Sequence, residues 1–162
     1  MYIKKIILVI VMCFCMTSCS DMQSSAYPNV SLDSADCNIE YCGKNFSAQI
    51  TNIGNLTSVR FTAPSTVDGM TYILTSDKCE ISFGELKYSS QKNQLDNSAL
   101  PMMIHLILSS SSPEELTEIS HTDVNAVFGG VADVFRFDLQ CDRSTGSLRE
   151  ISSEKAHLKV SF

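Results

Sequence analysis

The segment LPMMIHLIL, Leu100–Leu108, determines the expected architecture, because it is apolar nearly all round and shows no strand-like alternation. Pro101 suits the first turn of a helix, and Ser98 is a suitable N-cap residue. A helix that is apolar on every side has to be buried on every side. At 1.5 Å per residue it spans only about 15 Å, which is too short to cross a bilayer. We therefore expect a short helix that lies against the concave face of a sheet.

The segments on both sides of this helix alternate between apolar and polar residues, which is typical of strands with one buried face. Short connections between them favour an antiparallel meander, with Gly146 available for a hairpin turn and Gly129-Gly130 for a bend or bulge. The expected fold class is α+β, a curved antiparallel β-sheet (an incomplete barrel) wrapped around one apolar α-helix. The alternation runs through residues 46–51, 57–63, 70–74, 79–83, 134–141, 148–152 and 156–162.

The charge of the chain excludes some classes of partner. The 162 residues carry a net charge of −6, and loss of residues 1–18 with Lys4 and Lys5 would make it −8. Phosphate backbones and anionic lipid heads are bound by clustered Lys and Arg. We therefore expect no nucleic-acid partner and no electrostatic attachment to a membrane.

The first residues have the composition of an export signal. Lys4 and Lys5 precede the apolar run Ile6–Met16, which fits the hydrophobic core of a signal peptide and is too short for a spanning helix. Residues 16–19, Met-Thr-Ser-Cys, resemble the lipobox of bacterial lipoprotein signals, in which small residues precede the lipidated cysteine.

This resemblance implies that Cys19 receives a diacylglyceryl group and becomes the new N-terminus. Two acyl chains anchor a protein stably where a single chain does not. The resulting protein would lie on the extracytoplasmic side of the cell membrane. The alternative is that Cys13, Cys15 and Cys19 are ordinary apolar residues of a signal cleaved by another peptidase.

The composition predicts three segments. Residues 1–18 are a lipoprotein signal peptide, and residues 19–36, polar and Ser-rich, are a flexible tether. Residues 37–162 form a single antiparallel-sheet domain.

A lipidated N-terminus, a meander and one apolar helix together resemble the small clostridial lipoproteins with a LolA-like domain. The segment VRFTAPSTVDGM, Val59–Met70, is similar to their Phe-x-x-Pro…Gly segment, and DRSTGSLREI matches their final hairpin. The family implies a cell-envelope location and makes an apolar ligand, such as an acyl chain, a candidate. It implies no activity, and no binding residue carries over.

Four cysteines follow Cys19 in the sequence. Cys37 and Cys42 are the most local pair and are the candidate disulfide, whereas Cys79 and Cys141 occupy inward positions of expected strands. An anaerobic host would leave all four reduced. No second Cys pair or His pair has zinc-ligand spacing, so we expect no metal. Beyond the lipid on Cys19 we expect no cofactor.

No motif indicates an enzyme: the sequence has no Gly-x-Ser-x-Gly, phosphate loop or His-Glu-x-x-His. His105 lies in the apolar helix, where a buried neutral ring is the default. SSPEELTE, Ser111–Glu118, resembles a capped acidic helix start with a solvated face.

The density of flexible apolar side chains in the helix motivates the first functional hypothesis. An acyl chain or other lipid would bind between sheet and helix and contact Met102, Met103, Leu106 and Ile107. The alternative is a structural or protein-interaction module in which the helix is only core. The sequence names no protein partner.

Overall fold

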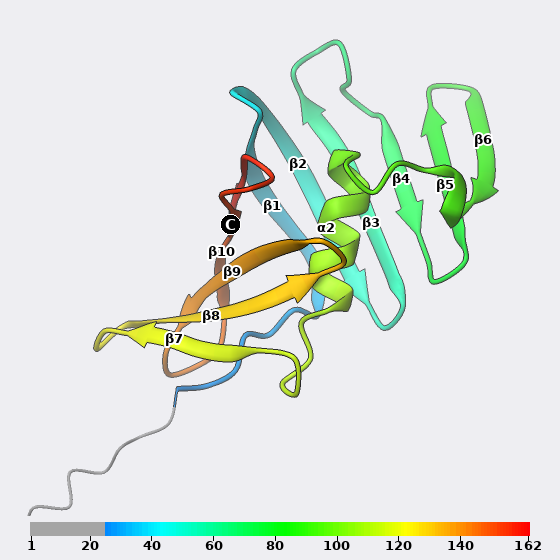
Figure 1. Ribbon diagram of the computed structural model, residues 1–162. Helices are drawn as coiled ribbons and strands as arrows, with labels where there is room; N and C mark the ends of the chain where they lie inside the picture. Colours follow the sequence, from blue (N-terminus) through cyan, green and yellow to red (C-terminus); the bar gives the residue numbers. More distant parts are fainter. Residues whose placement is uncertain (1–24) are drawn as a thin grey trace, which may run out of the picture.

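The computed structural model describes residues 25–162, which form one antiparallel sheet of eleven strands and one long helix (Figure 1). The signal peptide and Cys19 predicted above lie outside these residues. The first half of the sheet consists of β1 (Leu32–Tyr41), β2 (Lys44–Ile53), β3 (Leu56–Ala63), β4 (Thr71–Leu74), β5 (Lys78–Phe83) and β6 (Leu86–Gln91). After the 3-10 turn η1 (Lys92–Gln94) and helix α2 (Leu100–Ser109) come β7 (Thr117–His121), β8 (Asn125–Ala132), β9 (Phe135–Asp142), β10 (Leu148–Ser153) and β11 (Leu158–Ser161).

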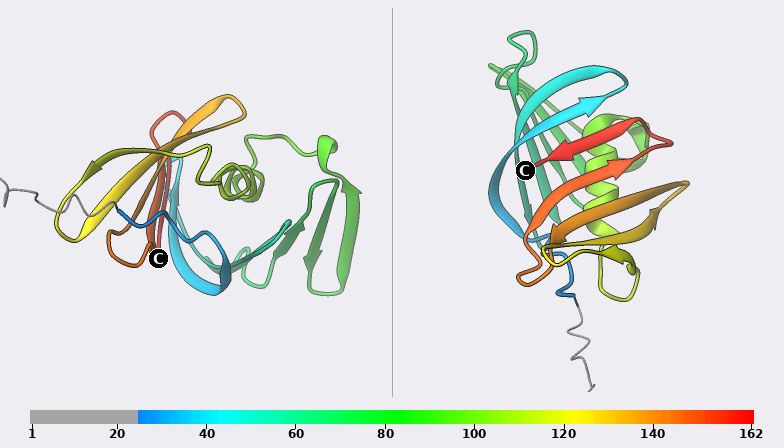
Figure 2. Two further views of the ribbon diagram at one scale, coloured as in Figure 1. Left: turned by 90° about the horizontal axis from the view of Figure 1, so that it is seen from below. Right: turned by 90° about the vertical axis from the view of Figure 1, so that its left-hand side faces the viewer.

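The strand order is β6-β5-β4-β3-β2-β1-β11-β10-β9-β8-β7. Two antiparallel meanders therefore extend in opposite directions from the central pair, β1 and β11. Helix α2 connects the strands at the two outer edges, β6 and β7. The sheet curves around the helix without closing, as the view along the helix axis shows (Figure 2). The fold class expected from the sequence agrees with this curved sheet around one helix.

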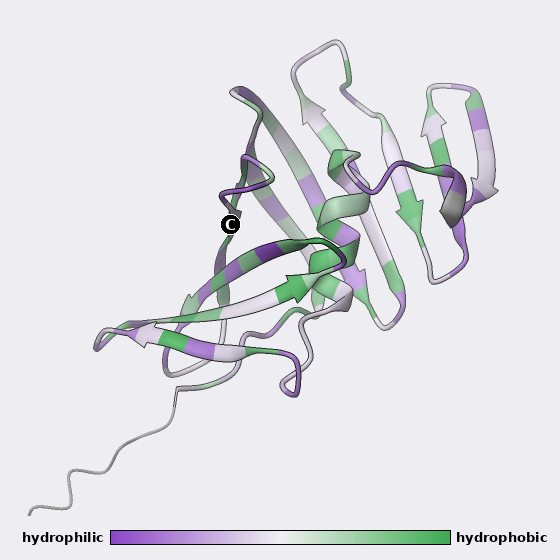
Figure 3. Cartoon of the chain, in the orientation of Figure 1, coloured by the Kyte–Doolittle hydropathy of each residue, from purple (hydrophilic) through white to green (hydrophobic). Residues whose placement is uncertain are grey.

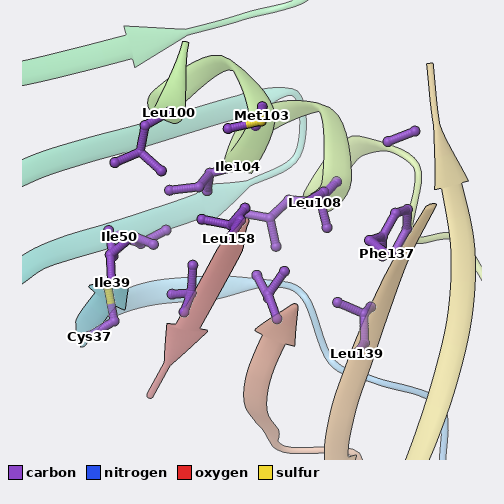
Figure 4. Packing of buried hydrophobic residues seen from close by; sticks show 14 of the residues in the cluster. Cys37, Ile39, Ile50, Leu100, Met103, Ile104, Leu108, Phe137, Leu139 and Leu158 are labelled. Carbon is purple, nitrogen blue, oxygen red and sulfur yellow. The ribbon is translucent and has the colours of Figure 1, made fainter. Parts of the chain in front are cut away.

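The core lies between α2 and the concave face. Alternate residues of β9, Phe135 to Cys141, are buried, and Val59 of β3 and Ile50 of β2 are fully buried. Helix residues such as Ile104 and Leu108 extend into this cluster (Figure 4), and the hydropathy colouring shows the same alternation along the strands (Figure 3). Within residues 25–162, no helix has the length and apolar character needed to cross a membrane.

Helix α2 matches its predicted range within one residue, and all of its residues except Leu106 and Ser109 are buried. Its cap differs from the prediction. Ala99 occupies the N-cap position without a side-chain bond, while the amide of Ser98 donates to Asp96 Oδ1 at 2.8 Å. Pro101 in the first turn removes one of the amides that a cap would otherwise satisfy.

The flexible tether predicted for residues 19–36 is wrong for the part that the structure describes. Residues Leu32–Asp36 belong to β1, and residues 25–31 run along the β9–β10 turn. There the amide of Ala26 donates to Arg143 O at 2.9 Å and the amide of Asn29 to Gly146 O at 2.7 Å. Because backbone groups make these contacts, the polar composition of the segment does not reveal them.

The two glycine predictions have different outcomes. Gly146 adopts a φ of +73° in the β9–β10 turn, as expected. Gly129 and Gly130 instead lie inside β8, where the side chains of Ile119 and Phe137 lie over their α-carbons. Close packing, rather than a bend, is the reason for these glycines.

Candidate functional site

The first candidate site is an apolar row on the concave face of β4–β6. Cross-strand pairing places Ile81 opposite both Tyr72 and Tyr88, and Phe83 opposite Leu86. These five side chains share the face of Leu74 and Cys79, which pack on Met102 of α2. We refer to Tyr72, Ile81, Phe83, Leu86 and Tyr88 as the concave apolar row.

The row becomes progressively more exposed toward the sheet edge. Tyr72 and Ile81 are half-buried, whereas Phe83, Tyr88 and Leu86 are 40%, 61% and 75% exposed. On its inner side the row continues into the core, because Tyr72 meets Phe61 edge-on with ring centroids 6.2 Å apart. An apolar surface that leads from the core to an open edge can accept a flexible apolar ligand.

Helix α2 covers only the base of β4–β6. There, Leu74, Cys79 and Met102 form a small buried cluster with Leu95 and Leu106 partly buried against it. The larger cluster joins α2 to β1–β3 and β8–β11. The helix is therefore packed mainly against β1–β3 and β8–β11, and most of the row on β4–β6 stays uncovered.

The helix residues predicted to contact a ligand lie mostly in the core. Met102 and Ile107 are fully buried and Met103 is 3% exposed, so these three side chains fill the space between sheet and helix. Only Leu106 is half-buried, on the side of the small cluster. Of the four, Leu106 alone is placed to reach a molecule on the concave apolar row.

The second candidate site is a polar cleft at the C-terminal end of α2, with a volume of about 590 Å³. It has one cationic residue and no carboxylate among its lining residues, although the whole chain is acidic. Its size lies in the range of small-molecule sites. The lining residues are Pro28, Asn29, Val30, Ser31, Asn52, Gly54, Asn55, Ser76, Lys92, His105, Leu108, Ser109, Ser111, Ser112 and Pro113.

A chain of hydrogen bonds crosses the inner wall of this cleft. Asn52 Nδ2 donates to Val30 O at 2.7 Å, which turns Asn52 Oδ1 toward Thr57. Thr57 Oγ1 donates its one proton to Asn52 Oδ1 at 2.8 Å and lies 2.9 Å from His105 Nδ1. The next atom, His105 Nε2, is 3.2 Å from Lys92 Nζ.

These bonds fix the protonation of His105. Because Thr57 has already given its proton to Asn52, its oxygen accepts the Nδ1–H of His105. Nε2 is then unprotonated and accepts from the Lys92 ammonium. Burial first and the Lys92 charge second lower the pKa of His105 to about 4, so the ring is neutral at pH 7.

The four described cysteines are all free thiols. Cys37 is buried in β1 and donates to Ala48 O at 3.3 Å, whereas Cys42 is exposed in the turn that follows. The four residues between them belong to strand β1, so five extended steps place the two α-carbons about 16 Å apart, far beyond the roughly 7 Å limit for a disulfide. The structure does not bring the predicted pair together. Cys79 and Cys141 are buried, as expected.

The sequence pattern does not predict two features of these sites. β6, with Leu86 and Tyr88, has four polar residues among six and gives no clear strand signal. Lys92 lies thirteen positions from His105 in a turn, and no spacing rule links the two. Within residues 25–162, no cluster of three or more His, Cys, Asp or Glu residues could hold a metal ion.

No protein-family model matches the sequence, and no curated protein matches it. Among solved structures, the chain is similar to an uncharacterized conserved protein from Thermus thermophilus, with 11% identity, a TM-score of 0.49, and 78% of this chain and 73% of that chain covered. It is also similar to the LolA superfamily protein NE2245 from Nitrosomonas europaea, with 14% identity and a TM-score of 0.39 over 76% of this chain. This chain spans 64% of NE2245. Both TM-scores lie below 0.5, so neither similarity bears on function.

Proposed function

We propose that this chain is a lipid-anchored protein of the cell envelope that binds an acyl chain along the concave apolar row. The anchor would be a diacylglyceryl group on Cys19, on the extracytoplasmic side of the membrane. The lipobox-like residues Met16–Cys19 support the anchor, and the resemblance of Val59–Met70 to a segment of LolA-like lipoproteins supports the location.

The exposure of the row is the observation that carries the binding proposal. Phe83, Leu86 and Tyr88 are 40%, 75% and 61% exposed and lie side by side on the face toward α2. Each methylene removed from water contributes about 0.8 kcal/mol. A chain of about ten methylenes along the row would therefore supply roughly 8 kcal/mol before association costs are subtracted, so the net affinity would be weaker than micromolar.

The core packing of α2 decides where the ligand would lie. Met102, Met103 and Ile107 are buried without a ligand, so the acyl chain would not replace them. It would run over the outer part of β4–β6, with Leu106 as its contact on the helix.

Binding of a dansyl-labelled fatty acid tests the proposal. The double variant Leu86→Ser/Tyr88→Ser should weaken binding at least tenfold, because it removes two exposed apolar side chains of the row. Val134→Ser is the matched control, because Val134 is 72% exposed at the β8–β9 turn and lies outside the row. Equal affinity of the double variant and the control, or no binding by the wild type, would reject the acyl-chain site.

The second candidate function is a protein-interaction module. The complete burial of Met102 and Ile107 favours it, since the helix then serves only as core. In that case the row would contact a protein, and no fatty acid would bind.

The anchor has a separate test. Cys19→Ser should move the protein from the detergent phase to the aqueous phase in a phase-partition experiment. A variant that still partitions with the detergent would contradict the lipid anchor and leave the binding proposal unaffected.

A further inference from the structure

The polar cleft at the end of α2 has a charge pattern that differs from the rest of the chain. The molecule carries a net charge of −6, yet the lining residues of the cleft include Lys92 and no Asp or Glu. None of them belongs to the concave apolar row, so this cleft is a second site that does not depend on the acyl-chain proposal.

Lys92 is held in place by one hydrogen bond, and its ammonium group has further hydrogen-bond donors. One of its three N–H bonds is directed at His105 Nε2, 3.2 Å away, and the His105 ring is itself fixed by Thr57. Two N–H bonds of the ammonium group remain for other acceptors. Because His105 is only 2% exposed and neutral at pH 7, it positions the lysine without adding a charge of its own.

Polar side chains from separate segments line the same cleft as Lys92. Asn55 lies in the β2–β3 turn and Ser76 in the β4–β5 turn, and their amide and hydroxyl groups can donate to an oxyanion that also contacts Lys92. Ser112 also lines the cleft, but its hydroxyl already donates to Glu115 Oε2 at 2.9 Å, so it has no proton left for a ligand.

The carbonyl groups at the C-terminal end of α2 carry partial negative charge, which opposes the binding of an anion. Hydrogen bonds to these carbonyl groups reduce that opposition. Ile107 O accepts from the amide of Ser110 and from Ser111 Oγ, and Leu106 O also accepts from the Ser110 amide. These bonds satisfy two of the last carbonyl groups and reduce the negative charge that faces the cleft.

We infer that this cleft binds an oxyanion, a carboxylate or phosphate group, through the Lys92 ammonium and the side chains of Asn55 and Ser76 that line the same cleft. The group has two chemical sources: a free small anion, or the head of an amphiphile. The competing explanation is that Lys92 only stabilises the C-terminal end of α2.

Titration of the full-length protein with inorganic phosphate, followed by NMR, tests the inference. Saturable shifts should appear at Asn52, Asn55 and His105. Lys92→Met should weaken phosphate binding at least tenfold, while Lys92→Arg should retain it within a few-fold. Lys87→Met is the control, because Lys87 is an exposed lysine of β6 outside the cleft.

A second variant separates binding from folding. Asn55→Asp places a negative charge on the cleft wall at an exposed turn position, so it should weaken phosphate binding without lowering the Tm. Unchanged affinity in both Lys92→Met and Asn55→Asp, or no saturable binding by the wild type, would overturn the inference in favour of a purely structural lysine.

A short-chain phosphatidic acid below its micelle concentration distinguishes the two sources. Tighter binding of this lipid than of phosphate, reduced by both Lys92→Met and Leu86→Ser, identifies an amphiphile whose chain reaches the concave apolar row. Equal affinities for phosphate and for the lipid, both reduced by Lys92→Met and neither reduced by Leu86→Ser, identify a free anion.

Discussion

Thr57 Oγ1 lies 2.9 Å from His105 Nδ1 at the centre of the buried face of α2. The bond joins the first buried position of β3 to the helix. A second proton on the ring would have to bind Nε2, and the contact between Nε2 and the Lys92 ammonium would then be lost. A histidine has therefore become a neutral part of the core, and this makes the fold sensitive to acid.

The stability of the protein should fall as the pH decreases from about 6.5 to about 4. The pKa of His105 is about 4 in the folded state and 6.5 in the unfolded state, so the unfolded chain binds more protons in this window. Stability is fully present above pH 6.5 and decreases by about 3 kcal/mol at pH 4. Urea denaturation at several pH values measures the change.

His105→Asn provides the control for this prediction. The Asn amide can replace the Nδ1–H donor to Thr57 but does not titrate, so the difference between wild type and variant isolates the imidazole. Equal pH dependence of the two proteins between pH 4.5 and 6.5 would show that other groups are responsible.

Gly130→Ala should destabilise the fold by about 1–3 kcal/mol, because a Cβ there would lie 2.4 Å from the Phe137 ring, which is buried. Gly129→Ala is the comparison. Its Cβ would lie 2.6 Å from the end of the Ile119 side chain, which is 61% exposed and can move. Thermal unfolding of the two variants should show a clearly larger loss for Gly130→Ala.

Gly146→Ala should detach residues 25–31 from the β9–β10 turn. A Cβ at Gly146 would lie 2.1 Å from the carbonyl oxygen of Tyr27, so the two backbones could not both stay in place. Gly84→Ala has a similar positive φ, +59°, but its Cβ would meet nothing within 4 Å. Limited proteolysis should therefore cut the N-terminal segment faster in Gly146→Ala only.

Cys42 should react with thiol reagents at pH 8 far faster than Cys37, Cys79 or Cys141. Burial raises the pKa of the Cys37 thiol to about 12 and also raises the pKa values of Cys79 and Cys141, whereas Cys42 is exposed. Peptide mapping by mass spectrometry after brief alkylation gives the order. Rapid labelling of Cys37 would mean that β1 opens readily.

The strands with a regular alternation, such as β3 and β9, could be predicted because one face of each is buried at every second residue. β1 was missed because its pairing with β2 shifts between Leu32 and Ala35, and this irregularity breaks the period. β7 was missed for another reason. All five of its residues are exposed, so it has no apolar face to detect.

The segment Ser111–Glu118 shows how a correct local signal can mislead. One of the two bonds of a capping box does form, because the amide of Ser112 donates to Glu115 Oε2 at 3.4 Å. The chain nevertheless leaves the turn after Leu116, which is buried against the core, and enters β7. The burial of Leu116 in the core therefore outweighs the local preference of this segment for a helix.

The candidate sites depended on information that alternation does not contain. Their exposed residues come mainly from turns and from the outer strands β5 and β6, where neighbours are set by strand order and not by spacing. The sequence identified the helix, which contributes residues to both sites, and the neutral state expected for His105. It could not show which side of the helix the sheet leaves open.

The central position of β1 and β11 affects the order in which the sheet can form. Only Asn38–Tyr41 and Leu158–Ser161 join the two meanders through strand pairing. A chain made from its N-terminus must therefore keep the inner edge of β1 unpaired until Leu158–Ser161 have been made. Loss of those few residues would divide the sheet through its middle, whereas truncations usually fray a domain from its rim.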